Sequence, residues 1–346
     1  HFEKMLYDQA MLALAYSEAY ELTGKDTYAD TAREIFNYVL RDLCSLEGVF
    51  YSGEDADSEG VEGKFYLWKL SDIRENLPGL EAEVFIRAYN LKEEGNFPDE
   101  ATKQYTGSNI PHRLNSSNDT LALEMGMSRE EIGKLLKSAR EKLYNIREKR
   151  TRPQLDDKVL TDWNGLMVAA LAYAGRILNN TEYTQYAENA AKFILDNMLE
   201  SGKKLLHRYK EGQAGINGFL DDYAFFTWGL WELYTATNKD FYLQKSVDIT
   251  HTMLDQFWDT EQGGFYMTAN NSEELLFRPK ESFDGAIPSG NSVALNVMAD
   301  LLLSGENGNL KQSSKELIQA FARAVRQYPT GFAHFLCGLD KAYEFL

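Results

Sequence analysis

A dense run of acids near the N-terminus is the first feature of this sequence that could do chemistry. Residues 51–60 read YSGEDADSEG, and Asp55 and Asp57 begin the Asp-x-Asp pattern of a calcium-binding loop. Such a loop needs a bidentate glutamate as its twelfth residue, and that position is Tyr66 here. Because tyrosine supplies no carboxylate, we expect no calcium site and assign no metal ligands. We interpret Asp55 and Asp57 as acids at the lip of a cavity, with a solvated acidic turn as the alternative.

Four further polar clusters lie where we expect helices to begin. They read HFEKMLYDQA (1–10), LTDWNGL (160–166), FLDDYAF (219–225) and IPSGNSV (287–293). Thr161 or Asp162, Asp221 and Ser289 would be ordinary N-caps that complement the helix dipole. Capping does not require the aromatic and amide residues that accompany them. We therefore predict a ligand-binding set that also includes two histidines: His1, Trp163, Asn164, His207, Tyr223 and Asn291.

Carboxylic acids from these segments and from PKESFDGAIPSGN (279–291) are the candidate catalytic groups: Asp55, Asp57, Asp162, Asp222, Glu281 and Asp284. The leading pair is Asp57 with Asp222, because a loop residue and a helix-start residue could face each other across a cavity. One acid with a raised pKa would protonate a leaving oxygen, and a second, ionised acid would activate water. Aromatic rings and amides around such acids are typical of sugar sites.

Other catalytic schemes lack their motifs. The sequence has no Gly-x-Ser-x-Gly nucleophile elbow, no His-Glu-x-x-His zinc motif and no phosphate-binding loop. We therefore predict no cofactor.

Composition and charge narrow the class of protein. The 346 residues are 44% hydrophobic and 26% charged, which is typical of a globular chain. The net charge of -17 argues against partners such as nucleic acid and anionic membrane surfaces, because no basic stripe exists. No run approaches the roughly 18 apolar residues of a membrane-spanning helix. Cys44 and Cys337 have no metal-site spacing, so we expect buried free thiols and a cytoplasmic location.

A repeated helical hairpin must position the polar clusters. From Trp163 to Leu178 apolar residues recur at helical spacing, a short turn follows, and a second apolar stripe runs to Met198. The same plan returns at 11–40, 219–257 and 288–325. The first helix of each pair is apolar on nearly all sides and the second on one side. First helices should therefore be buried in an inner layer, and second helices should form an outer layer.

Stacked hairpins of this length predict an all-α fold, an (α/α)6 toroid with inner helices that all begin at one mouth. A superhelix open at one side is a less economical alternative. Short aromatic pieces with glycine, GVFYSG (48–53), LLHRYKEG (205–212) and GGFYMTAN (263–270), predict β-ribbons in the loops between hairpins.

We expect one domain over 1–346 with about eleven helices. It carries an irregular insertion at about 69–157. In the insertion we predict one or two short helices around 71–90, a loop to about Gly126, and a helix opened by the capping box of Ser128 and Glu131.

Several of these segments, in this order, make the chain resemble a known family. HFEKMLYDQA, EDADSEG, GKFYLW, LTDWNGL, FLDDYA and PKESFDGAIPSGNS are similar to segments of the thioredoxin-domain-containing family that includes a spermatogenesis-associated protein and bacterial relatives. The resemblance covers nearly the whole chain and implies an (α/α)6 barrel of the six-hairpin glycosidase type, without the family's N-terminal thioredoxin-like domain. Gln9, Gly53 and Phe283 depart from the family's usual residues. The barrel is also similar to those of N-acylglucosamine 2-epimerases.

Three functions follow as hypotheses. The first is a glycoside-processing enzyme that uses carboxylate acid/base catalysis at the mouth of the barrel. The second is a non-catalytic module that binds a glycan or a partner and presents it to the thioredoxin-like domain. This hypothesis predicts an acidic cavity whose acids are all satisfied by Arg, Lys or backbone amides, leaving none with a shifted pKa. The third is a sugar 2-epimerase-like isomerase that uses His1 and His207, although the epimerases' histidine pattern does not match here residue by residue. A small saccharide is the expected ligand in each case.

Overall fold

The chain forms two compact units in the computed structural model, which describes residues 2–99, 102–113, 117–272, 276–306 and 308–345. Unit 1 comprises His1–Lys4 with Glu54–Leu155, and unit 2 comprises Met5–Gly53 with Asp156–Leu346. The chain passes from one unit to the other within three two-residue strands, β1 (Lys4–Met5), β2 (Gly53–Glu54) and β5 (Leu155–Asp156). The predicted insertion at 69–157 falls almost wholly within unit 1.

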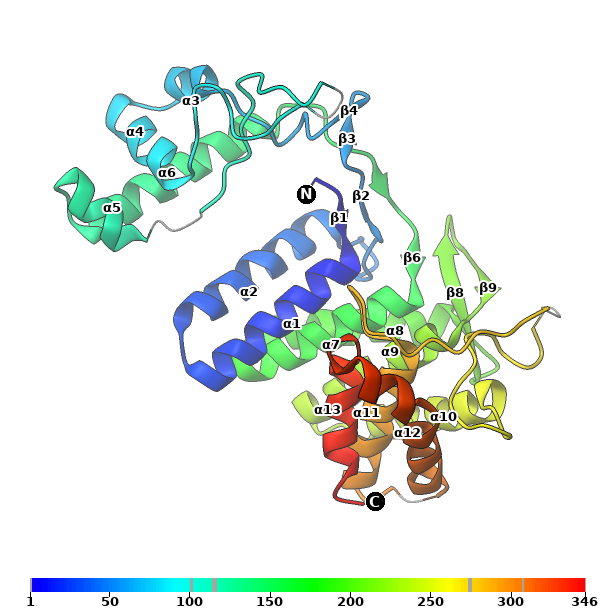
Figure 1. Cartoon of the computed structure of the whole chain (residues 1–346). Helices are drawn as coiled ribbons and strands as arrows, with labels where there is room; N and C mark the ends of the chain where they lie inside the picture. The colour runs from blue at the N-terminus through cyan, green and yellow to red at the C-terminus, as the bar shows by residue number, and fades with distance from the viewer. Residues whose placement is uncertain (1, 100–101, 114–116, 273–275, 307, 346) are drawn as a thin grey trace. The chain divides into compact units, whose positions relative to one another are not determined.

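Unit 2 is built from helical hairpins, as the repeat predicts (Figure 1). Four helix pairs follow one another along the chain and a single helix ends the series. The pairs are α1 (Leu6–Thr23) with α2 (Asp26–Tyr38), α7 (Thr161–Ile177) with α8 (Thr181–Asn197), α9 (Leu220–Thr237) with α10 (Asp240–Phe257), and α11 (Gly290–Leu303) with α12 (Leu310–Gln327); the last helix is α13 (Ala333–Ala342). A π-helical turn, Val39–Leu43, extends α2, and a 3-10 turn, Pro329–Gly331, precedes α13.

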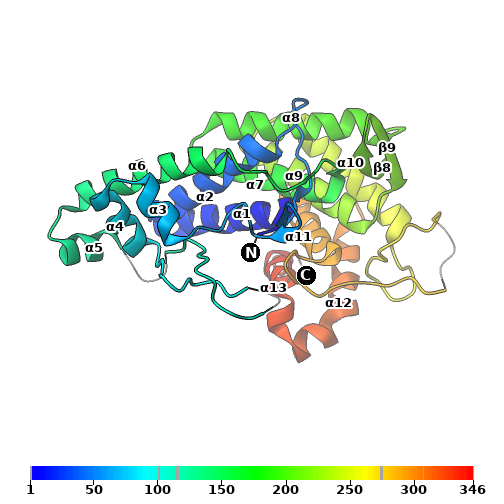
Figure 2. The same cartoon turned by 90° about the horizontal axis from the view of Figure 1, so that it is seen from above.

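The predicted inner and outer layers are confirmed, except that α1, the first helix of the first pair, buries only one stripe rather than nearly every side. Helices α1, α7, α9, α11 and α13 pack in that order as neighbours, and Figure 2 shows α8 and α10 on the outer side of α7 and α9. Helices α7, α9 and α11 are buried on nearly every side, whereas α8, α10 and α12 bury one stripe each. A helix that is apolar all round must be covered on all sides, so the difference in composition decides the layer.

Two glycines allow the inner helices α7 and α9 to approach closely. A Cβ built at Gly165 would lie 2.5 Å from the backbone nitrogen of Phe226, and one at Gly229 would lie 2.8 Å from the carbonyl oxygen of Gly165. Backbone atoms cannot move aside as a flexible side chain does. The close contact between α7 and α9 therefore requires glycine at both positions.

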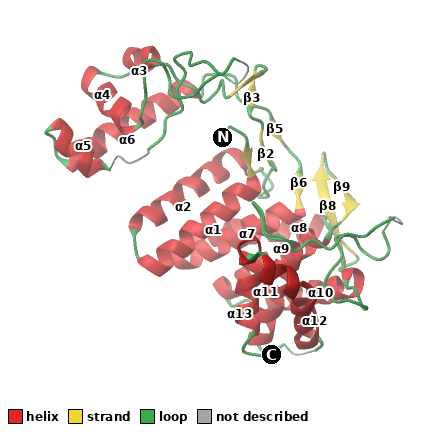
Figure 3. Ribbon diagram, in the orientation of Figure 1, coloured by secondary structure: helices red, strands yellow, loops and turns green. Residues whose placement is uncertain are grey.

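Strands are short outside one antiparallel sheet (Figure 3). In that sheet β8 (Lys204–Lys210) pairs with β9 (Gln213–Asn217), with β7 (Leu199–Glu200) and with β6 (Val159–Leu160). This confirms the ribbon predicted at 205–212. The ribbon predicted at 48–53 is reduced to a single bridge between Cys44 and Phe50 and the short strand that begins at Gly53. The ribbon predicted at 263–270 is reduced to a single bridge between Trp258 and Phe265.

Unit 1 contains a β-hairpin and four helices among its described residues. They are β3 (Asp57–Ser58) with β4 (Val61–Glu62), α3 (Leu70–Asn76), α4 (Gly79–Ala88), α5 (Asn118–Met125) and α6 (Arg129–Arg147). The predicted capping box of α6 is confirmed, because Ser128 Oγ accepts from Glu131 N–H and Glu131 accepts from Ser128 N–H.

The sequence analysis missed α5, which interrupts the loop predicted up to Gly126. This helix is capped by Ser117, whose Oγ accepts from Thr120 N–H at 3.0 Å, and it ends at Gly126 with a φ of 65°, typical of a C-terminal glycine. The described residues thus hold thirteen α-helices rather than eleven.

Two further sequence predictions concern membranes and thiols. Within the described ranges, no helix has both the length and the apolar composition that crossing a bilayer requires. Both cysteines are free, as predicted, but Cys337 is exposed and Cys44 is half-buried, so the prediction of two buried thiols was wrong.

Candidate functional site

A cavity of about 400 Å³ in unit 2 collects the starts of four inner helices. We call it the inner-helix cavity. Its lining includes Tyr7 from the start of α1, Trp163 from α7, Asp221 from α9 and Ser289, the N-cap of α11. The loop before α11 supplies the other lining residues: Glu281, Phe283, Gly285, Ala286, Ile287 and Pro288. The predicted convergence of these helix starts is therefore present in unit 2.

Aromatic rings form part of the cavity wall. The rings of Tyr7 and Trp163 meet edge to face with centroids 4.9 Å apart. The ring of Phe283 is 48% exposed and stacks parallel to that of Tyr328. Exposed aromatic faces beside carboxyl groups can bind the apolar faces of a sugar ring while the acids bind its hydroxyls.

Asp221 is the acid whose environment is most unusual among those lining the cavity. Its Oδ1 is buried without a hydrogen-bond partner, and a Cβ added to Gly290 would come within 2.3 Å of that oxygen. Burial first, and then the charges of Asp222 and Glu281, raise the pKa of Asp221 to about 7, while the backbone N–H of Gly290 and His207 act in the opposite direction. Near neutral pH a substantial fraction of this carboxyl therefore carries a proton.

Asp222, the next residue, is fully buried and has many partners. Both of its oxygens lie 3.0 Å from Nδ1 of His207, and they also accept the backbone N–H groups of Asp162 at 3.0 Å and Phe219 at 2.8 Å. Asp222 therefore fixes the start of α9, the start of α7 and the ring of His207 together.

The charges of this group are coupled. Burial, and next the charge of Asp222, raise the pKa of Asp162 well above its ordinary value. Burial lowers the pKa of His207, but the hydrogen bond and charge of Asp222, with smaller contributions from Asp162 and Asp221, outweigh it and raise that pKa. The arrangement favours a protonated Asp162 beside a His207–Asp222 ion pair.

These three side chains could also hold a metal ion, because their ligand atoms lie within 4.8 Å of one another. However, Nδ1 of His207 already bonds to both oxygens of Asp222. A cation would have to replace that contact.

Three predicted binding residues have other partners in the structure. Asn164 accepts from the backbone N–H of Phe50 and donates to its carbonyl, both at 2.9 Å. Asn291 does the same with Phe265, at 2.8 and 3.0 Å. Tyr223 Oη accepts from the backbone N–H of Leu205. Asn164, Asn291 and Tyr223 are buried, and each ties a segment outside the helices to an inner helix.

The predicted N-caps are correct in one case of three. Ser289 caps α11, accepting from Ser292 N–H at 3.1 Å. Helix α7 begins after Leu160 and α9 after Phe219, so Thr161, Asp162 and Asp221 are helical residues rather than caps. Thr161 instead donates its hydroxyl to the carbonyl of Leu206.

The other predicted catalytic acids are distributed as follows. Glu281 lines the inner-helix cavity. Asp284 accepts from the backbone N–H groups of Ser289, His334 and Phe335, so it anchors α13 beside α11. Asp55 and Asp57 are exposed residues of unit 1, where Asp55 accepts from the N–H of Asp57. The pairing of Asp57 with Asp222 stays a prediction because the two acids belong to different units, and His1 lies outside the described residues.

Sequence analysis did not select Asp221, Tyr7 or Phe283 as site residues, although all three line the cavity. The acids of the FLDDYAF segment are adjacent, and helical periodicity alone could not tell which would face the cavity. Tyr7 had a signal that was not used, since it stands near the start of the first inner helix, where Trp163 stands in α7.

The fold belongs to the class of helical barrels built from (α/α) hairpins. The structure of cellobiose 2-epimerase from Bacillus thermoamylovorans superposes with a TM-score of 0.56 at 11% identity, covering 99% of this chain and 75% of that one. A GH76 alpha-mannanase from Bacteroides thetaiotaomicron gives a TM-score of 0.54 at 9% identity, covering 99% and 69% of the two chains. At this identity the likeness establishes the (α/α)6 fold class with short strands, as predicted.

Among named proteins, the chain is homologous to spermatogenesis-associated protein 20. It is 34% identical to the Homo sapiens protein over 375 aligned positions and 33% identical to the Rattus norvegicus protein over 376. Each alignment covers all of this chain and 47% of the relative, so the chain spans about half the length of these curated relatives. No family model matches the sequence.

Proposed function

We propose that the inner-helix cavity binds a saccharide and that the chain is a glycoside-processing enzyme with Asp221 as its general acid. The observation that carries this proposal is the Asp221 carboxyl, which lines the cavity with one buried oxygen and a pKa raised to about 7. A general acid is most effective when its pKa lies near the working pH. Asp221 would donate its proton to the leaving oxygen of a glycosidic bond.

Glu281 is the proposed second carboxyl of the reaction. It lines the same cavity and is exposed, and its charge contributes to the raised pKa of Asp221, so the two groups interact. As a carboxylate it would accept a proton from the attacking water. We prefer Asp221 with Glu281 to the pair of Asp57 with Asp222, because Asp222 is wholly buried with its oxygens occupied.

Asp162, His207 and Asp222 support the acid rather than act on substrate in this scheme. The charge of Asp222 raises the pKa of Asp221, and His207 partly opposes that effect. Together with the desolvation of Asp221, this network holds the pKa of that carboxyl near neutral pH. Trp163, Tyr7 and Phe283 would contact the sugar faces.

The non-catalytic alternative is disfavoured by its own criterion. A module that only binds a glycan predicts acids that are satisfied by partners and have no shifted pKa, and the pKa of Asp221 is raised to about 7. Association with a thioredoxin-like domain and a cytoplasmic location stay predictions from the resemblance and the composition.

A second candidate is proton transfer at a sugar carbon by His207, as the isomerase hypothesis requires. The favouring observation is that Asp222 holds Nδ1 of this histidine at 3.0 Å, while the side chain keeps 21% of its surface exposed. Above its raised pKa, where the imidazole is neutral, a histidine oriented by a carboxylate can act as a general base. Exchange of deuterium from solvent into a reducing sugar, lost in His207→Ala, would distinguish this chemistry from hydrolysis.

The test of the main proposal compares Asp221→Asn with wild type on a panel of aryl glycosides and oligosaccharides. Since an amide cannot donate the catalytic proton, kcat/KM should fall roughly 10²–10⁴-fold while sugar binding persists. In wild type, kcat/KM should decline as pH rises through about 7, where Asp221 loses its proton.

Asp255→Asn is the matched control, because Asp255 is an exposed acid on α10 and its loss should leave turnover unchanged. Full turnover in Asp221→Asn would contradict the assignment. Sugar binding without turnover by wild type would favour the binding module.

A further inference from the structure

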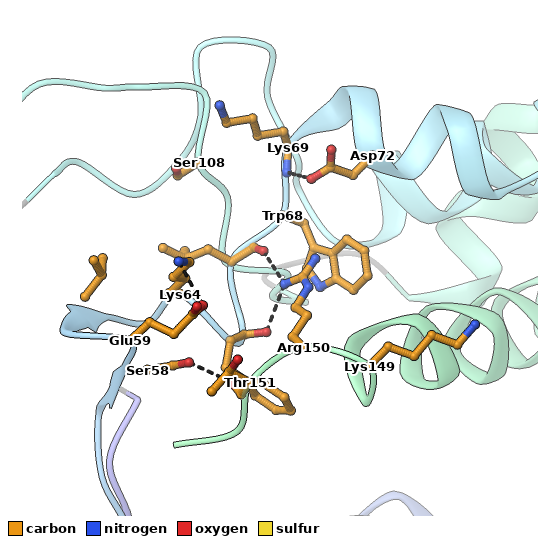
Figure 4. A pocket seen from close by; sticks show the side chains of 13 residues that line it. Ser58, Glu59, Lys64, Trp68, Lys69, Asp72, Ser108, Lys149, Arg150 and Thr151 are labelled. Carbon is orange, nitrogen blue, oxygen red and sulfur yellow. Dashed lines mark hydrogen bonds and ion pairs between the residues drawn. The ribbon is translucent and has the colours of Figure 1, made fainter. Parts of the chain in front are cut away.

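A second cavity, of about 690 Å³, lies within unit 1, and we call it the unit 1 pocket. Its wall comes from the β3–β4 hairpin, the start of α3 and the segment after α6 (Figure 4). The lining residues are Ser58, Glu59, Val61, Lys64, Phe65, Leu67, Trp68, Lys69, Asp72, Ser108, Lys149, Arg150 and Thr151. Nothing in the proposed function in unit 2 involves them.

The charge of this pocket is opposite to that of the chain. Four cations and two acids line it, whereas the whole sequence carries a net charge of -17. Glu59 is paired with Lys64 at 2.8 Å, and Asp72 accepts the backbone N–H of Lys69 at 3.1 Å. In the described part of the chain, the ammonium groups of Lys69 and Lys149 have no acidic partner. The pocket therefore presents an excess of positive charge to whatever enters it.

Arg150 is held rigidly at the centre of the pocket. Its Nη1 donates to the carbonyls of Phe65 at 2.9 Å and Leu67 at 2.8 Å, and its guanidinium lies 4.0 Å from the ring centre of Trp68 (Figure 4). Among the described residues it forms no salt bridge, so its charge is balanced by carbonyl dipoles, a ring face and the charge of Asp72 without direct contact. A fixed, half-buried guanidinium that no described carboxylate contacts directly is well suited to an anionic ligand.

The negative end of the α6 dipole explains part of this arrangement, because it attracts cations. Lys149 and Arg150 follow the last residues of α6, where cations are favoured. That effect does not extend to Lys64 or Lys69, which lie in the segment between β4 and α3. Cations from two separate segments of the chain thus line one cavity.

From this geometry we propose that the unit 1 pocket binds a small phosphorylated metabolite, with Arg150 as the fixed phosphate-binding residue. Lys69 and Lys149 point away from Arg150 in Figure 4 and are exposed, so their flexible side chains would turn toward the bound phosphate. A cavity of this volume is much larger than an isolated anion and fits a phosphorylated sugar or a similar molecule. Several separated cations match the dianionic charge and three acceptor oxygens of a phosphate group. The hydroxyl-bearing residues Ser108 and Thr151 at the rim add hydrogen-bonding capacity.

The test measures binding of inorganic pyrophosphate and of glucose 6-phosphate to the full chain by calorimetry at fixed ionic strength. Glucose and malonate serve as comparison ligands without phosphate. We expect saturable binding of both phosphorylated probes, weakened roughly tenfold by Lys69→Ala and by Lys149→Ala, because each removes one charge-assisted hydrogen bond. Both lysines are exposed, so the variants should melt as wild type does.

Lys137→Ala is the matched control, because Lys137 is an exposed lysine of α6 that does not line the pocket. Its loss should change affinity less than about twofold, as expected for screened surface charge. Equal weakening by Lys137→Ala, malonate binding as tight as that of pyrophosphate, or no saturable binding of either phosphorylated probe would each overturn the proposal.

Discussion

Asp221 and Asp222 are neighbours in sequence and have opposite environments. Asp222 accepts hydrogen bonds from His207 and from two backbone N–H groups, which stabilise its negative charge. Asp221 lies against the cavity with a buried oxygen that has no partner, and its proton is therefore retained to a pKa of about 7. Two identical side chains thus have different roles, set by the hydrogen-bond donors around each.

Asp222→Asn tests the electrostatic role of this residue on its neighbour. The neutral amide no longer stabilises the imidazolium, so we expect the pKa of His207 to fall below its wild-type value. Titration of the imidazole nitrogens by NMR measures the change, and the signal of the exposed His251 is the internal reference. An unchanged titration of His207 would show that Asp222 is not its partner in solution.

At the scale of elements, two equivalent asparagines join loops to inner helices. Asn164 in α7 and Asn291 in α11 each bind both backbone polar groups of one phenylalanine, Phe50 or Phe265. An amide side chain offers one acceptor and two donors, so a single residue can satisfy both groups of a buried backbone segment. Two of the repeated helical hairpins therefore share the same hydrogen-bonding arrangement.

Replacing either asparagine by alanine should leave two buried backbone groups without partners. We expect Asn164→Ala and Asn291→Ala each to lower the free energy of unfolding by about 2–4 kcal/mol. Urea denaturation measures the effect, with Asn189→Ala on the exposed side of α8 as the control that should change it by less than about 0.5 kcal/mol. A loss of sugar binding with unchanged stability would instead support the predicted ligand-contacting role.

Helix spacing provides another test at this scale. Gly165→Ala places a methyl group 2.5 Å from the backbone of α9, so it should cost at least about 2 kcal/mol of stability. Gly133→Ala is the contrasting substitution, since the nearest atom to the added carbon on α6 is 3.9 Å away. At this position the better helix propensity of alanine should raise the free energy of unfolding by about 0.5–1 kcal/mol. Thermal unfolding of both variants would reveal opposite shifts, and a shift of the same sign would contradict the packing argument.

For the molecule as a whole, buried acids control how stability depends on pH. Burial, and for Glu232 also the charge of Asp300, raise the pKa of Asp221 and of Glu232 to about 7. An acid whose pKa is raised binds its proton more tightly in the folded chain than in the unfolded one. Its favourable contribution is therefore present near pH 4 and lost as pH rises to 7. The raised pKa of His207 acts in the same direction, since its ion pair with Asp222 is lost as pH rises.

We accordingly expect the chain to be more stable at pH 5.5 than at pH 8, with Glu232→Gln reducing the difference. The neutral amide removes the cost of burying a charge, so the variant should be more stable than wild type by about 2 kcal/mol at pH 8 and by less at pH 5.5. Urea denaturation at both pH values measures this, and Glu182→Gln on the exposed start of α8 is the control. Equal effects of Glu232→Gln at the two pH values would refute the linkage.

The sequence by itself determined the hairpins, their inner and outer layers, and the polar helix starts. Apolar spacing in segments such as 163–178 depends on the covalent order of residues, and burial follows from it directly. Capping at Ser128 and Ser289 was also predictable, because a cap involves atoms only a few residues apart. The short helix α5 was missed because its cap signals stood within a stretch rich in asparagine and serine.

Only the tertiary structure decided which polar residues at those starts face the cavity. Asp221 faces it while Asp222 points to His207, and this depends on a rotation of α9 that is fixed by packing against α7 and α11. Asn164 and Asn291 likewise turn toward backbone groups 114 and 26 residues away in sequence. Hydrogen-bond partners so distant along the chain have no local signal, so the roles of these residues required the folded molecule.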